Sequence, residues 1–204
     1  MTERPKLLVA TNNWGKLREY AHLLGELPFE LETLADAGIA DEVEETGSTM
    51  EENAIRKATE YVGLSGLVTL ADDSGLEVDA LGGEPGVQSR RYAGGNATDS
   101  ERNRYLLEKL KDVPPEKRGA RFRCVIAIAT PDGRVDTRQG VCGGVIALGP
   151  RGEGGFGYDP VFYLPEIGRT MAELTLEEKN RISHRARAAQ AVRDILLRIG
   201  QQQT

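Results

Sequence analysis

The chain has 204 residues, of which 39% are hydrophobic and 28% are charged. This composition is typical of a globular protein with a buried core, and it excludes a disordered chain. The formal net charge of −6 argues against a protein that grips a nucleic acid backbone, because such proteins present a basic face. No apolar run has the length of a membrane span or a signal-peptide core, so we expect a cytoplasmic protein.

Hydrophobic periodicity predicts alternating strands and helices in the first half of the chain. Strands are expected at residues 6–10, 29–34 and 67–71. Asn12 or Asn13 is placed to cap a helix after the first strand, and Thr49 with Glu52 fits a capping box that opens the next helix. The third strand runs straight into an acidic turn, Asp72–Gly75.

The second half of the chain combines a hairpin with further helices. Thr98 opens one helix, and the final helix begins near Ser183 with a buried apolar stripe. Residues 122–130 and 135–148 are expected to form a long antiparallel hairpin. Cys124 and Cys142 lie on either side of its turn, and we expect two reduced, buried thiols, not a disulfide or a metal site.

These elements predict an α/β fold with a mixed sheet, in which ligands bind at the loops that follow strand ends. Residues 1–200 are expected to form one domain, and residues 201–204 a frayed tail.

The segment from Thr11 to Lys16 joins the first strand to the first helix. Backbone N–H groups at a helix N-terminus favour an anion, and Lys16 adds a full positive charge. The segment is not a P-loop, because the glycine spacing is missing. Phosphate binding and an ordinary capped helix with a solvated lysine are equally compatible with these residues.

Two acidic pairs, Glu44–Glu45 and Asp72–Asp73, are candidate ligands for magnesium. Hard cations prefer carboxylate oxygens, and a metal-bound water beside a carboxylate supplies a nucleophile and a base. The alternative is a solvated acidic turn, since Asp-Asp-Ser-Gly is common in turns.

Two later segments carry groups that suit a nucleotide. In Gly154–Pro160, three glycines allow close approach of the backbone, and Phe156 and Tyr158 could stack on a base. Lys179 and Ser183–Arg185 offer hydrogen-bond donors for a purine or a phosphate. The alternatives are a flexible surface loop, a solvated lysine and a structural histidine at a helix start.

Together these segments resemble the inosine triphosphate pyrophosphatase family, whose members act on noncanonical purine triphosphates. The resemblance runs from about residue 7 to residue 199. Its blocks, in chain order, are Ala10–Thr11 with Asn13 and Lys16, Glu44–Gly47, Glu52–Ala54, Ala71–Leu76, Leu81–Gly83, Pro85–Gly86, Ser89 with Arg91–Tyr92, Gly154–Pro160, Glu178–Lys179 and Ser183–Arg185.

The resemblance implies an elongated α/β fold with a central mixed sheet flanked by helices, and two lobes with an active-site cleft between them. It implies a homodimer that uses Mg²⁺ to hydrolyse ITP, dITP and XTP to the monophosphate and pyrophosphate. Asp73 is the implied proton acceptor, and Glu44 with Asp73 the implied metal ligands. The implied substrate contacts are Thr11, Asn12, Asn13, Trp14, Gly15, Lys16, Ser74, Phe156, Gly157, Tyr158, Asp159, Lys179, His184 and Arg185. Asn53 and Lys57, on the helix expected to face the same cleft, are ranked second as candidate site residues.

Three other functions remain open at this point. One is a pyrophosphatase of related architecture that acts on modified pyrimidine triphosphates. Another is a nucleotide-binding module without turnover, although the presence of both acids and lysines favours an enzyme. The third is a nucleic-acid-binding protein, which the acidic charge disfavours.

Overall fold

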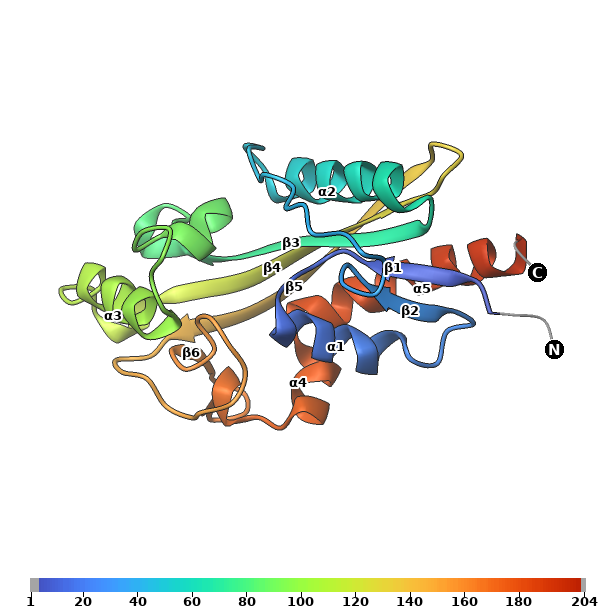
Figure 1. The fold of residues 1–204 in the computed structure, drawn as a ribbon. Helices are drawn as coiled ribbons and strands as arrows, with labels where there is room; N and C mark the ends of the chain where they lie inside the picture. Colours follow the sequence, from blue (N-terminus) through green and yellow to red (C-terminus); the bar gives the residue numbers. More distant parts are fainter. Residues whose placement is uncertain (1–3, 203–204) are drawn as a thin grey trace. The chain divides into compact units, whose positions relative to one another are not determined.

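The computed structural model describes residues 4–202 (Figure 1). Its strands are β1 (Lys6–Val9), β2 (Glu30–Thr33), β3 (Val68–Val78), β4 (Gly119–Ala129), β5 (Val135–Ile146), β6 (Phe162–Leu164) and β7 (Arg169–Thr170). Its α-helices are α1 (Trp14–Leu24), α2 (Met50–Ser65), α3 (Asp99–Lys109), α4 (Leu176–Ile182) and α5 (His184–Gln202). Short 3₁₀ turns lie at Asp79–Leu81, Gly86–Arg91, Pro115–Lys117 and Met171–Glu173.

Within residues 4–202 the strands form one seven-stranded sheet in the order β2-β1-β3-β4-β5-β6-β7. Strand β1 pairs in parallel with β2 and β3, whereas β6 pairs antiparallel with β5 and β7. The sheet is therefore mixed, which confirms the predicted α/β class. Strands β4 and β5 are neighbours joined by a short turn, as the hairpin pattern predicted.

The chain divides into two compact units. The first unit comprises the residues up to Asp73, Cys124–Gly140 and the residues from Arg185 onward. In it α2 covers one face of the strands and α1 with α5 covers the other (Figure 1). The predicted apolar stripe of α5 is buried throughout, at Ala188, Val192, Ile195, Leu196 and Ile199.

The second unit comprises Ser74–Arg123 and Val141–His184. Its core joins the end of β3, the start of β4 and the end of β5 to α3, which contributes Leu106. Strands β6 and β7 and helix α4 were not predicted. They have three, two and seven residues, so none is long enough to show a clear hydrophobic period.

The predicted acidic turn is wrong, because Asp72–Gly75 lies inside strand β3. This eleven-residue strand continues without interruption to Val78. Asp, Ser and Gly favour turns in isolation, but here the two carboxylates find buried partners on both faces of the sheet, and tertiary contacts override local preference.

The predicted helix caps are confirmed. The Asn13 side chain caps α1, and Thr49 with Glu52 forms the capping box of α2. Helix α5 continues through Gln202, and residues 203–204 of the expected frayed tail lie outside the described range. Both cysteines are buried, and neither forms a disulfide in the described part of the chain. Among the helices of residues 4–202, none has the length and hydropathy needed to cross a membrane.

Candidate functional site

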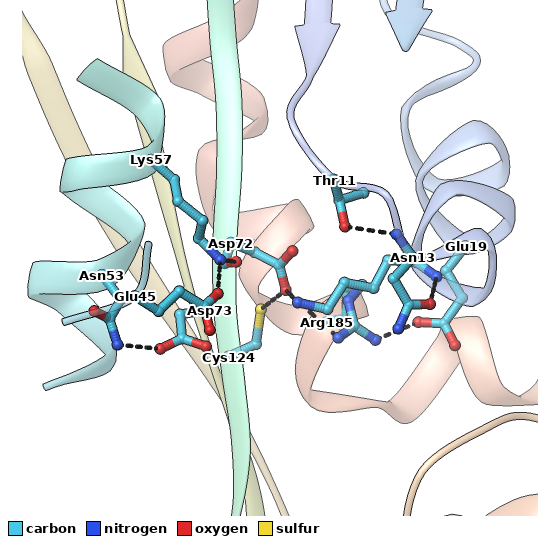
Figure 2. A network of polar contacts seen from close by, with 11 residues as sticks. Thr11, Asn13, Glu19, Glu45, Asn53, Lys57, Asp72, Asp73, Cys124 and Arg185 are labelled. Carbon is cyan, nitrogen blue, oxygen red and sulfur yellow. Dashed lines mark hydrogen bonds and ion pairs between the residues drawn. The ribbon is translucent and has the colours of Figure 1, made fainter. Parts of the chain in front are cut away.

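Strand β3 presents two adjacent acids to opposite faces of the sheet, because successive side chains of a strand alternate (Figure 2). Asp72 points toward α1 and α5, where it meets Lys16 and Arg185. Asp73 points toward α2, where it meets Asn53. A one-residue step along the strand therefore gives the two carboxylates different hydrogen-bond and ion-pair partners.

Asp72 is buried in a network of charges within the first unit. Its Oδ2 lies 3.0 Å from Lys16 Nζ and 3.5 Å from Arg185 Nη2. Arg185 in turn donates from Nη1 to Glu19 Oε2 at 2.6 Å. The side chain of Asp72 is 1% exposed and that of Arg185 is 1% exposed, so little water screens these pairs.

The charges around Asp72 decide its protonation. Burial alone would raise the pKa of Asp72, but Lys16, Arg185 and Lys57 outweigh burial and hold that pKa well below its usual value. Burial and the neighbouring Asp72 carboxylate both raise the pKa of the Cys124 thiol, to about 12. At neutral pH Asp72 is therefore ionised, and the Cys124 thiol beside it is protonated.

Asp73 is bound to the first turn of α2 and surrounded by a separate set of groups. Its Oδ2 accepts a hydrogen bond from Asn53 Nδ2 at 3.0 Å. Lys57 Nζ, one turn further along α2, donates to Glu45 Oε1 at 2.6 Å and to the Asp72 carbonyl oxygen at 2.5 Å. Burial raises the pKa of Asp73, Lys57 lowers it, and the nearby Glu45 carboxylate raises it again, with a net upward shift.

The two acids of the Glu44–Glu45 pair have different environments. Glu45 is partly buried and lies close enough to Asp73 to affect its pKa. Glu44 is exposed. The family resemblance implies Glu44 as the second metal carboxylate, whereas the acid of this pair that affects the pKa of Asp73 is Glu45.

Two neighbouring carboxylates suit a magnesium ion, which is commonly held by one or two protein carboxylates together with water and phosphate oxygens. The upward effect of Glu45 on the pKa of Asp73 is the repulsion that a bound cation would relieve. No group of three or more Asp, Glu, His or Cys side chains forms a closed metal centre in residues 4–202. The donor set fits a partly hydrated hard cation, and not a structural zinc.

The predicted phosphate segment forms the N-terminus of α1. Asn13 Oδ1 accepts from the Lys16 N–H at 3.1 Å, and Thr11 Oγ1 accepts from the Asn13 N–H at 3.2 Å. These contacts fix the turn, and Lys16 is held beside it by Asp72. Asn12 is exposed, and the Trp14 side chain is 79% exposed. Gly15 is partly buried.

The second unit gathers several of the predicted nucleotide contacts. Asp159 Oδ2 accepts from Lys179 Nζ and from the Phe156 N–H, at 2.5 and 2.9 Å. Lys179 Nζ lies 4.8 Å from the centroid of the Phe156 ring, a cation–π contact. Asp159 and Lys179 are both buried, so this group is a preformed unit of an acid, a cation and an aromatic ring.

The other predicted contacts are distributed between the two units. His184 is buried and stacks on Phe122 with ring centroids 4.7 Å apart. Tyr158 donates from its hydroxyl to the Ser89 carbonyl oxygen at 2.9 Å, and Ser74 is partly buried in the same unit. Arg185, the next residue after His184, belongs to the first unit and contacts Glu19 and Asp72 there.

Sequence reasoning missed several residues that the structure brings to these groups. Glu19 follows Lys16 at the spacing of an ordinary surface ion pair on a helix, so its burial gave no signal. Asp99 and Asn103 of α3 contact the backbone of Gly157. Their position more than fifty residues before the loop could not be read from local patterns.

A protein-family model described as the Ham1 family matches residues 7–195. The chain belongs to the Ham1 family. Among relatives, it is 54% identical over 191 residues to a Geobacter sulfurreducens protein named dITP/XTP pyrophosphatase, covering 94% of this chain and 96% of the relative. It is 54% identical over 187 residues to a Thermus thermophilus protein of the same name, covering 92% and 89%.

Solved Ham1 structures have the same fold. A HAM1 protein from Coxiella burnetii superimposes with a TM-score of 0.85 at 44% identity, covering 94% of this chain and 98% of that one. The Ham1 protein of Staphylococcus aureus gives a TM-score of 0.83 at 41% identity, covering 94% and 97%. The Ham1 fold therefore extends over nearly all of this chain.

Replacing each of the two adjacent acids by asparagine is expected to change stability in opposite directions. Asp72→Asn leaves Lys16 and Arg185 buried without their shared anion and should cost about 3 kcal/mol of unfolding free energy at pH 7. Asp73→Asn removes a carboxylate that burial and Glu45 disfavour, so stability should equal or exceed that of the wild type. Urea denaturation measures both.

The pH dependence of these two effects follows from the pKa directions. The lowered pKa of Asp72 stabilises the fold above the unfolded-state value, so the deficit of Asp72→Asn should shrink below about pH 4. Because the pKa of Asp73 is raised in the folded state, the fold loses stability as pH rises above the pKa of this carboxyl in the unfolded chain. Any gain in stability of Asp73→Asn should therefore appear above about pH 4. Equal losses in both variants at pH 7 would contradict this assignment.

Proposed function

We propose that this protein hydrolyses ITP, dITP and XTP to the nucleoside monophosphate and pyrophosphate, and so removes deaminated purines from the nucleotide pool. Relatives that align over nearly the whole chain at about half identity carry the name dITP/XTP pyrophosphatase. The structural observation that carries the proposal is the arrangement around β3, where Asp73 lies among Asn53, Lys57 and Glu45 and Asp72 holds Lys16.

The triphosphate is bound at the N-terminus of α1. Unpaired backbone N–H groups of the first turn and the Lys16 ammonium attract phosphate oxygens. An ammonium has three donors, so Lys16 can bind a phosphate oxygen while it keeps its contact with Asp72. Thr11 and Asn13 keep the turn in the required conformation.

Asp73 and Glu45 would hold a magnesium ion, and Asp73 accepts the proton of the attacking water. When bound, the metal offsets negative charge on the phosphate chain. The water attacks the α-phosphorus, a bond forms from its oxygen to that phosphorus, and the bond to the pyrophosphate oxygen breaks. Asn53 orients Asp73 for this step by its hydrogen bond to Oδ2, and Lys57 offsets the charge of Glu45.

The second unit recognises the base. Phe156 offers a ring for stacking, and Lys179 and His184 offer donors to the oxygen at C6 of hypoxanthine or xanthine. Adenine has an amine at that position, which cannot accept a hydrogen bond from these donors, and this is a ground for its rejection. Arg185 was predicted as a further base donor, and its contacts with Glu19 and Asp72 support a role in holding Asp72.

We further propose a homodimer in the cytoplasm that binds no nucleic acid. The dimer rests on the family resemblance, and the formal net charge of −6 supports the last point.

The substrate class is tested by incubating the protein with magnesium and a panel of triphosphates and measuring pyrophosphate and orthophosphate separately. We expect pyrophosphate from ITP, dITP and XTP, with ATP and modified pyrimidine triphosphates spared. Asp73→Asn should lower the rate by at least about 100-fold, because a positioned general base contributes that much or more. Asp136→Asn, a change of the same kind at an exposed position of β5, is the control.

Three results would count against the proposal. Release of orthophosphate would indicate a different bond, and binding without any release would indicate a nucleotide-binding module. A near-normal rate in folded Asp73→Asn would remove that residue from the chemistry.

Substitutions at the two neighbouring positions show whether Glu44 or Glu45 is the second metal ligand. Glu45→Gln should raise the magnesium concentration for half-maximal rate by roughly tenfold, because it removes the acid that faces Asp73. Glu44→Gln should change it by less than about twofold, since that side chain is exposed. Electron paramagnetic resonance of Mn²⁺ binding without nucleotide gives a second readout. A larger effect of Glu44→Gln than of Glu45→Gln would identify Glu44 as the metal ligand.

A further inference from the structure

Gly157 lies between Phe156 and Tyr158 in the loop proposed to recognise the base, and helix α3 binds its backbone on both sides. The Gly157 N–H donates to Asp99 Oδ2 at 2.6 Å. The Gly157 carbonyl oxygen accepts from Asn103 Nδ2 at 3.0 Å. Asp99 and Asn103 are one helical turn apart, so they reach the loop from the same face of α3.

These two bonds fix two different peptide planes. The N–H of Gly157 belongs to the peptide that follows Phe156, and its carbonyl belongs to the peptide that precedes Tyr158. The peptide before Phe156 is fixed as well, because the Phe156 N–H donates to Asp159 Oδ2 at 2.9 Å. Three successive planes are thus held, and the direction in which the Phe156 side chain leaves the backbone is determined.

The loop adopts a conformation that needs this support. Gly155 and Gly157 have φ angles of +70° and +63°, a region that other residues rarely adopt. A Cβ at Gly155 would lie 2.0 Å from Asp159 Oδ2, so the acid sits directly against the backbone. A loop with two such glycines has many accessible conformations, and external hydrogen bonds are needed to select one.

If Asn103 served only to fill space, an apolar side chain at this position would stabilise the fold more. It is 6% exposed, and its Oδ1 has no hydrogen-bond partner among residues 4–202. A buried acceptor without a partner destabilises the fold, whereas leucine has a similar volume and no such cost. The bond from Nδ2 to Gly157 is the polar contact that accounts for an amide there.

The two hydrogen bonds that join Asp99 and Asn103 to Gly157, here called the clamp, hold the backbone next to Phe156, which is proposed to contact the base. The same Asp159 carboxylate that binds the Phe156 N–H also binds Lys179, whose ammonium lies over the Phe156 ring. Fixing the backbone at Gly157 therefore fixes the ring relative to the ammonium. A preformed site loses less entropy on binding and distinguishes ligands more sharply than a mobile one.

We propose that Asn103, supported by Asp99, is a positioning residue that sets the nucleobase selectivity of this protein by clamping Gly157. The proposal rests on the proposed function, because it assumes that Phe156 and Lys179 bind the base. Neither α3 residue touches the substrate, and both act through the backbone of the loop.

The test compares binding of two probes to the full-length protein by calorimetry in the presence of magnesium. IMP contains the base, and inorganic tripolyphosphate contains only phosphates. Asn103→Leu should weaken IMP roughly tenfold, the effect of losing one buried hydrogen bond, and should leave tripolyphosphate within about twofold. The preference for ITP over ATP in kcat/KM should fall to a similar degree. Arg104→Ala, at an exposed position of α3, should change neither.

Asp99→Ala gives a second variant, since Asp99 is more exposed than Asn103 and its loss perturbs the core less. It should weaken IMP in the same direction. Normal IMP affinity in both variants, or equal weakening of both probes, would overturn the proposal. A third variant, Phe156→Ala, distinguishes failure of this positioning proposal from failure of the proposed function. Unchanged IMP affinity in Phe156→Ala would mean that the loop does not recognise the base.

Discussion

The buried carboxylate of Asp72, held between Lys16 and Arg185, is the interaction on which the first unit depends. It connects strand β3 to both helices of one face, α1 and α5. With Glu19 the group contains two cations and two anions, so the buried charges cancel. Such a network is stable only when complete, because removal of one member leaves another charge buried without compensation.

This network explains how two neighbouring aspartates come to have different properties. The alternation of a strand sends Asp72 into a cationic setting that lowers its pKa, and Asp73 into a setting where burial and Glu45 raise its pKa. Pairs of acids whose environments drive their pKa values apart are typical of catalytic sites. Asp72 fixes Lys16 in place, and the contrasting environment of Asp73 supports its proposed roles as metal ligand and proton acceptor.

Local patterns predicted much of the fold. The period of the apolar residues and the caps at Asn13, Thr49 and Thr98 identified the longer helices, because these signals lie within a few residues of each other. They failed at Asp72–Gly75, where a turn-like composition sits in a strand that distant charges stabilise. For the same reason they could not show that Glu45 affects the pKa of Asp73, or that Asn103 of α3 binds the backbone of Gly157.

In the proposed reaction, water activated beside Asp73 attacks the α-phosphorus. Hydrolysis of dITP in water enriched in the heavy isotope of oxygen tests it most directly, with the products analysed by mass spectrometry. We expect one labelled oxygen in dIMP and none in pyrophosphate, since the new bond forms at the α-phosphorus. Label in pyrophosphate, with unlabelled dIMP, would mean attack at the β-phosphorus and would overturn the proposed mechanism.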